Sequence, residues 1–303
     1  MAFEPVGRAR PFEPSSEVDR SERAQRNGGL PQLDFGQGSG AGPSTPFIDY
    51  LHLDVLLQLQ HPRTGEPAEA SFLVLGQIHE LLFTTLFSEV DRARDLLLLD
   101  RLPDAVHRLH RVERHLRLLE ATWEPLSVIT PDEFTYFRDQ LGVASGVQSF
   151  TFRQLEFVLG NKSRRMAEAH RPVPWAYERV DRALRAPSVY DAGLRVLSKH
   201  GPTLPPECLD YDYADEYRPQ QEVEDAWAEV YREPDRYRSL HVLAEALVDV
   251  SFRYTCWHDR HVLTVERLMG SKPGSGGSDG VRWLRSGPRP RYFPELWSAR
   301  SAL

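Results

Sequence analysis

Hydrophobic residues recur every three or four positions along most of this chain, which is typical of helices that bury one face. The clearest stripe consists of Val106, Leu109, Val112, Leu116 and Leu119, with Arg and His between them. Residues 68–99 are apolar with little polar relief, so we expect a helix there that is buried on most sides. No strand-like alternation extends beyond a few residues. The pattern predicts an all-α fold, a helical bundle in one main domain over residues 46–303.

Further helices are predicted over 47–60, 153–159, 180–186, 188–199, 222–231 and 239–268. Thr130 and Pro131, followed by two acidic residues, indicate a helix that begins with a threonine cap. Residues 202–206 break the helical pattern, and 270–280 form a loop rich in glycine and serine.

The first 45 residues differ from the rest because they are rich in Gly, Pro, Ser and charge. Such a composition buries too little apolar surface to offset the entropy of ordering the chain. We therefore expect a flexible N-terminal arm over 1–45 that becomes ordered only against a partner subunit.

Composition excludes several classes of protein. Hydrophobic residues make up 41% and charged residues 27%, as in ordinary globular proteins, and the formal net charge is −7. This charge argues against a nucleic-acid partner. No apolar run approaches the roughly 20 residues of a membrane span, and the first residues lack the apolar core of a secretory signal. Cys208 and Cys256 are isolated, which fits free thiols in a cytoplasmic protein.

One stretch that could carry chemistry runs from Trp257 through His258 and His261 into the glycine-rich loop. A neutral imidazole near the end of a long helix is a common haem ligand. Taken alone, a histidine in such a position is more often an ordinary surface or core residue. The loop could cradle a phosphate, but it lacks the Gly-Lys-Ser/Thr ending of a P-loop and no strand precedes it.

A second stretch places Arg138 among the aromatic residues Phe134, Tyr136 and Phe137. A guanidinium can hold a carboxylate through two hydrogen bonds while rings surround a side chain, which suits an aromatic amino acid. The alternative is a surface ion pair beside a cluster of packed helices.

Four linked motifs in this chain resemble those of the tryptophan 2,3-dioxygenase family. They are Tyr50 to Leu57, Phe137 to Glu156 with its Ser-Gly-x-Gln-Ser core, His261 to Gly280, and the closing Phe-Pro-Glu-Leu-Trp from Phe293 to Trp297. The resemblance runs in unbroken order over about 47–297. Serine stands at Ser275 where the family pattern has threonine, and Phe47 stands where a tyrosine is usual.

The resemblance implies a haem-dependent oxidoreductase of the family's helical fold, with haem b as its cofactor and O2 as co-substrate. It assigns the proximal iron ligand to His261, the substrate carboxylate to Arg138, the ring pocket to Phe72 and Phe134, the distal haem side to Ser145 and Gly146, and the substrate ammonium to Ser275. It also implies a homotetramer, or a dimer, in which Phe47 and Tyr50 reach the neighbouring subunit's pocket.

The main departure from the family lies at Gly76, which stands where the family has a distal histidine that hydrogen-bonds the indole N–H. His79 follows three residues later and so shares nearly the same helix face. It either serves the pocket or is packed and paired elsewhere. His258 is a competing candidate for the iron ligand.

We therefore expect oxygen insertion at the C2–C3 edge of the indole of L-tryptophan or a substituted tryptophan, such as a β-methyl derivative. Two oxygen atoms would give N-formylkynurenine and one would give a 2-oxindole. The alternatives are a histidine-ligated haem mono-oxygenase that hydroxylates L-tyrosine, and a haem sensor without turnover.

Overall fold

The computed structural model describes residues 45–274, 279–286 and 291–303, which fall into two units, Met1–His61 and Pro62–Leu303. In the first unit the predicted helix over 47–60 is broken into α2 (Pro46–Leu51) and α3 (Leu53–Leu56). The break is at His52, whose φ of 50° is left-handed. Within the described part of the chain no residue of α3 is buried. The predicted arm lies almost entirely outside the described residues.

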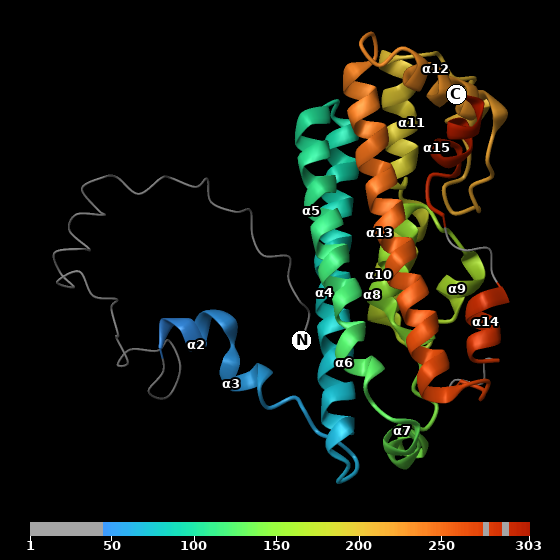
Figure 1. The fold of residues 1–303 in the computed structure, drawn as a ribbon. Helices are drawn as coiled ribbons and strands as arrows, with labels where there is room; N and C mark the ends of the chain where they lie inside the picture. Colours follow the sequence, from blue (N-terminus) through green and yellow to red (C-terminus); the bar gives the residue numbers. More distant parts are fainter. Residues whose placement is uncertain (1–44, 275–278, 287–290) are drawn as a thin grey trace. The chain divides into compact units, whose positions relative to one another are not determined.

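Long helices form the frame of the second unit. They are α4 (Pro67–Leu98), α5 (Leu102–Ala121), α11 (Val189–His200), α12 (Gln221–Arg232) and α13 (Arg238–Met269). Helix α5 packs along both α4 and α13, and Figure 1 shows these three helices side by side. The apolar stripe predicted on α5 is fully buried between them, which confirms the sequence pattern.

The remaining α-helices of the second unit are no longer than α11 and α12. They are α6 (Trp123–Ser127), α7 (Pro131–Arg138), α8 (Phe150–Leu159), α9 (Arg164–Glu168), α10 (Pro174–Arg185), α14 (Val281–Ser286) and α15 (Pro294–Ser298). The predicted start of α7 is confirmed, because Thr130 and Glu133 form a reciprocal capping box. No strand occurs over 45–274, 279–286 or 291–303, so the predicted all-α fold is confirmed.

Helix α4 differs from the expectation that it is buried on most sides. One face packs against α5, α8 and α11, while Val74 and Leu81 on the other are exposed. Among the described helices α4 also has the length and apolar content of a membrane span, contrary to the sequence expectation. Its packed face lies against three helices of the second unit, so we assign it to the bundle.

The Phe-Pro-Glu-Leu-Trp motif fastens α15 to the rest of the unit. The buried carboxylate of Glu295 accepts hydrogen bonds from the hydroxyls of Tyr190 (2.9 Å) and Tyr217 (2.6 Å) and from the backbone N–H of Gln220 (2.9 Å). The indole N–H of Trp297 donates to the Ser251 hydroxyl at 3.1 Å. This motif therefore has a structural role that ties α15 to α11, α13 and the segment before α12.

Candidate active site

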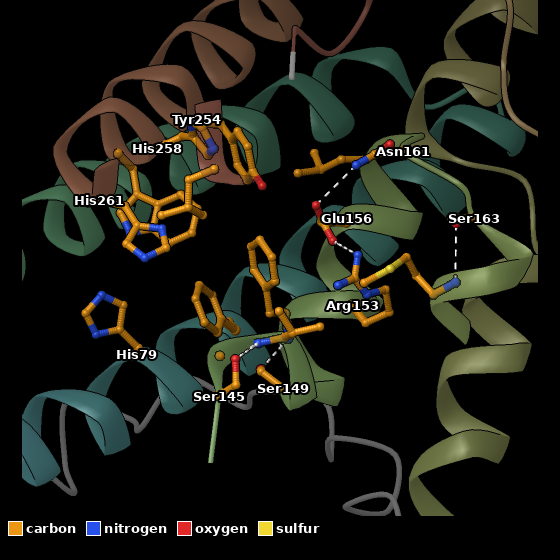
Figure 2. A pocket seen from close by; sticks show the side chains of 18 of the residues that line it. His79, Ser145, Ser149, Arg153, Glu156, Asn161, Ser163, Tyr254, His258 and His261 are labelled. Carbon is orange, nitrogen blue, oxygen red and sulfur yellow. Dashed lines mark hydrogen bonds and ion pairs between the residues drawn. The ribbon is translucent and has the colours of Figure 1, made fainter. Parts of the chain in front are cut away.

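A cavity of about 1450 Å³ runs through the second unit between α4, α8 and α13 (Figure 2). Most groups around His261 are apolar or aromatic: Phe72, Phe83, Trp123, Leu126, Phe134, Phe152, Trp257, Val265, Leu268 and Met269. Its volume exceeds the roughly 300–1,000 Å³ of ordinary small-molecule sites. It is therefore large enough for a prosthetic group and a substrate together.

His261 projects into this cavity from α13 (Figure 2). Its ring stacks on Trp123 with centroids 4.7 Å apart and planes 8° from parallel, and Trp257 lies 5.9 Å away. Burial, with smaller contributions from His258 and His79, lowers the pKa of His261 to about 3. Neither ring nitrogen hydrogen-bonds to any residue that the structure describes. His261 is therefore a neutral imidazole with a free lone pair, which is the state that binds iron.

Two tryptophans beside His261 were not predicted as site residues. The indole N–H groups of Trp123 and Trp257 are buried and have no hydrogen-bond partner within the described parts of the chain. Unpaired buried donors are uncommon in folded proteins, so these two are available to a bound water or ligand. Trp257 could have been found from the sequence, because it lies four residues before His261 on the same helix.

Gly76 lies in the wall of the same cavity, on α4. A methyl group built on its Cα would meet no atom within 4 Å, so the space left by this glycine is open. The departure from the family pattern therefore enlarges the cavity.

His79, one turn further along α4, is buried at 6% exposure and also lines the cavity. Its Nδ1 donates to the carbonyl of Leu75 at 2.8 Å, and its Nε2 lies 3.0 Å from the hydroxyl oxygen of Thr122. Its ring packs 4.7 Å from Trp123, and burial lowers its pKa. Both nitrogens are engaged, so His79 offers no free acceptor where the family's distal histidine would stand.

The rings of Phe72, Phe134 and Phe137 form a compact cluster between α4 and α7, with centroids 5.3–5.8 Å apart. Phe72 and Phe134 line the cavity, as the resemblance implies, whereas Phe137 is fully buried behind them. The three rings are inclined to one another by 52–84°, so they give one wall of the cavity an apolar but uneven surface.

Arg138 ends α7 at the edge of this ring cluster and is not part of the cavity wall. Its guanidinium donates to the carbonyl of Pro273, at the start of the glycine-rich loop. Its Nε–H is buried and has no partner among the residues placed by the structure. Arg138 therefore joins α7 to the loop and retains a donor for an anion.

The glycine-rich loop meets the cavity at Gly274 and Gly280. Gly280 has a φ of 60°, and a Cβ there would lie 2.3 Å from the carbonyl oxygen of Lys272, so only glycine fits. Ser275, the residue expected to contact the substrate ammonium, lies outside the described residues.

Of the other predicted site residues, Ser145 and Gly146 line the cavity, and the Ser145 hydroxyl accepts from the N–H of Val147 at 3.4 Å. Phe47 and Tyr50 lie on α2 in the first unit with 66% and 83% of their surface exposed. Their contact with substrate across a subunit interface stays a prediction.

His258, the competing ligand candidate, also lines the cavity, edge-on to His261 with centroids 6.5 Å apart. No group of three or more His, Cys, Asp or Glu side chains suited to a bare metal ion occurs in the described segments.

Comparison with known proteins agrees with this arrangement. The family described as tryptophan 2,3-dioxygenase matches residues 34–303 of this chain. The tryptophan 2,3-dioxygenase of Caulobacter vibrioides is 42% identical over 85% of this chain and 98% of its own length.

Two further relatives carry the same name. Tryptophan 2,3-dioxygenase 1 of Ralstonia nicotianae is 39% identical over 90% of both chains, and the enzyme of Burkholderia pseudomallei strain 1106a is 40% identical over 90% of this chain and 87% of its own. These matches confirm the family resemblance and the expectation of an oxidoreductase. The chain belongs to the tryptophan 2,3-dioxygenase family.

Proposed function

We propose that this protein binds haem b through His261 and uses O2 to oxygenate the indole of L-tryptophan or a substituted tryptophan. The observation that carries the proposal is His261 itself, a neutral imidazole without a hydrogen-bond partner in the described chain, in a large apolar cavity. The mostly apolar and aromatic lining of the cavity suits a porphyrin. When bound, the haem iron supplies the binding and activation of O2.

The substrate would be held by groups at the α7 end of the cavity. The Arg138 guanidinium has an unused buried donor, which a carboxylate would satisfy with charge-assisted hydrogen bonds. The ring cluster of Phe72 and Phe134 would pack against the indole. Ser275, through its place in the family motif, would contact the ammonium group. Together these contacts would hold the C2–C3 edge of the indole toward the haem, which is catalysis by orientation.

Gly76 favours a substrate larger than L-tryptophan. The open space at its Cα would accept a small substituent, such as a methyl group on the β-carbon. The indole N–H also loses the hydrogen bond of the missing histidine, and His79 does not replace it because both its nitrogens are engaged. One lost hydrogen bond costs about 1 kcal/mol, which loosens the orientation of the ring without abolishing binding.

The test is mass spectrometry of the product formed under ¹⁸O2 from L-tryptophan, β-methyltryptophan and L-tyrosine. Two labelled oxygen atoms indicate ring opening to an N-formylkynurenine, and one indicates a 2-oxindole. Turnover of β-methyltryptophan at least as fast as of L-tryptophan supports the enlarged pocket. Product from L-tyrosine alone would contradict the proposal. Haem binding without a spectral response to any of the three would indicate a sensor.

The variant Gly76→His tests the role of the missing side chain. Restoring an imidazole should move the product toward N-formylkynurenine and slow the turnover of β-methyltryptophan more than that of L-tryptophan. Gly76→Ala is the matched control, since it fills part of the space without a hydrogen-bonding group. An unchanged product ratio in Gly76→His would dismiss position 76 as the determinant.

The homotetramer, the contact of Phe47 and Tyr50 with a neighbouring subunit, and the cytoplasmic location stay predictions. Size-exclusion chromatography with light scattering measures the first of these directly.

A further inference from the structure

A continuous line of aromatic side chains leads away from His261 through the interior of the second unit. Its first steps are His261 to Trp257 at 5.9 Å, Trp257 to Tyr254 at 5.3 Å and Tyr254 to Tyr292 at 4.8 Å between ring centroids. Trp257, Tyr254 and Tyr292 are each less than 5% exposed. Figure 2 shows Tyr254 and His261 projecting from the same helix, α13, at the cavity.

The line continues past Phe293 to a group of three more tyrosines. Phe293 lies 6.0 Å from Tyr292 and 5.2 Å from Tyr190. Tyr190 is 5.5 Å from Tyr217, which is 6.2 Å from Tyr211. Tyr213 follows at 5.3 Å and is half-buried, so the line ends near the surface. We call Trp257, Tyr254, Tyr292, Tyr190, Tyr217 and Tyr211 the aromatic line.

The far members of this line have built-in proton acceptors. Tyr190 and Tyr217 both donate their phenolic protons to Glu295, and Tyr211 donates to Asp191. Burial and these carboxylates raise the pKa of all three phenols above the ordinary value, so each is neutral at rest. A neutral phenol can lose an electron readily only if its proton leaves at the same time, and here a carboxylate is already hydrogen-bonded to receive it.

We propose that the aromatic line is a one-electron path that carries oxidising equivalents from the haem site to Tyr190, Tyr217 and Tyr211 when no substrate is there to consume them. This inference rests on the proposed haem at His261 and goes beyond the oxygenation of tryptophan. Tryptophan and tyrosine are among the side chains most easily oxidised by one electron. The ring contacts supply short steps from Trp257 to Tyr292, and the step from Tyr292 to Tyr190 crosses the ring of Phe293.

The oxidant that we assign to this reaction is hydrogen peroxide. Its reduction to two water molecules breaks the O–O bond and consumes two electrons and two protons. Two tyrosines of the line supply one electron and one proton each, leaving two neutral phenoxyl radicals, and Glu295 and Asp191 relay the protons. The haem is unchanged overall, so its porphyrin is spared oxidative damage.

The chain offers a matched control for this path. The hydroxyl of Tyr231 also donates to a carboxylate, Glu245, at 2.6 Å, but its ring neighbours are His241 and Arg300. Tyr231 therefore shares the local chemistry of the terminal tyrosines without belonging to the aromatic line.

The experiment treats the haem-loaded ferric protein with hydrogen peroxide in the absence of tryptophan. Freeze-quenched samples are measured by electron paramagnetic resonance with ring-deuterated tyrosine, and trapped radicals are located by peptide mass spectrometry with a nitroso spin trap. We expect a tyrosyl signal, with adducts on the peptide that contains Tyr211 and Tyr217. Tyr254→Phe and Trp257→Phe should each lower this signal several-fold and speed the peroxide bleaching of the haem, whereas Tyr231→Phe should leave both unchanged.

Haem loading is measured from the Soret band before peroxide is added. This measurement separates the inference from the proposed function. A haem-loaded protein whose tyrosyl signal is absent, or is unchanged in Tyr254→Phe and Trp257→Phe, overturns the electron path and leaves the oxygenase proposal standing. Failure of the native chain to take up haem overturns both. The phenylalanine variants keep the ring packing, and equal haem uptake by native and variant proteins verifies their fold.

Discussion

Two regions of the second unit, one around His261 and a far one around Glu295 and Lys162, differ in how these buried polar groups are paired. Around His261, the indole N–H groups of Trp123 and Trp257 have no partner within the described chain, and the space at Gly76 is open. At the far end, Glu295 accepts three hydrogen bonds and Lys162 donates to three backbone carbonyls. Buried polar groups are normally paired, so the unpaired indole donors around His261 are available to a ligand, whereas Glu295 and Lys162 belong to the scaffold.

The largest effect on this comparison is expected from removing the imidazole of His261. His261→Ala should lose most of the bound haem, because it removes the imidazole that would hold the iron. The Soret absorbance per protein after haem loading measures the loss. His258→Ala is the control and should retain haem, and the reverse result would make His258 the ligand.

Arg138→Ala tests whether the unused donor beside the ring cluster binds substrate. Losing a charge-assisted pair of hydrogen bonds should raise the KM for L-tryptophan on the order of 100-fold. Arg138→Lys should recover only part of this, because an ammonium lacks the planar fork of the guanidinium. Steady-state kinetics of both variants, beside Arg260→Ala on the exposed face of α13, supply the measurement. An unchanged KM in Arg138→Ala would remove this residue from the carboxylate site.

Glu295→Gln tests whether the paired carboxylate of Glu295 stabilises the fold. An amide has only one acceptor oxygen for the three donors that now meet the carboxylate, so the free energy of unfolding should fall by about 2–3 kcal/mol. Urea unfolding followed by circular dichroism measures the change. Glu224→Gln, at an exposed carboxylate that accepts from Ser298, should change stability far less. Equal effects of the two variants would contradict a structural role for the Phe-Pro-Glu-Leu-Trp motif.

The free energy of unfolding of the native protein depends on pH through Lys162. It is 4% exposed, and burial lowers the pKa of its ammonium to about 7. The unfolded chain keeps that proton up to its ordinary pKa near 10.5, so the native state binds fewer protons above pH 7 and gains stability as pH rises. Between pH 6.5 and 8.5 the native protein should gain roughly 2 kcal/mol relative to Lys162→Met. Urea titrations at both pH values test this, and a constant difference would mean that Lys162 stays charged.

Much of the fold could be predicted because periodicity and caps are local signals. The helix expected over 239–268 is α13 (Arg238–Met269), and the one expected from Ser188 begins where the Ser188 hydroxyl accepts from the N–H of Asp191. The break at His52 could not be predicted, because the apolar spacing continues across this residue and its left-handed φ leaves no periodic signal. The exposure of Leu81 on α4 could not be predicted either, since a hydrophobic stripe does not reveal how many helices will cover it.

The residues of the candidate site that could be predicted lie in sequence motifs. The residues that could not be predicted are brought together only by the tertiary structure. Trp123 comes from the five-residue helix α6, which leaves no periodic signal, yet it stacks on His261 from 138 positions away. The pairing of His79 with Thr122 joins two helices and could not be read from spacing on α4. Arg138 was singled out for its aromatic neighbours, whereas its contact with Pro273 emerges only from the fold.

An exposed glycine within a long helix also carries a stability cost. Gly76 costs α4 about 0.5–1 kcal/mol relative to alanine, and no neighbouring atom prevents an alanine there. Any selection or design for heat resistance will therefore favour a larger residue at this position. Each such substitution would narrow the cavity, so a more heat-stable form of this protein would accept fewer substrates.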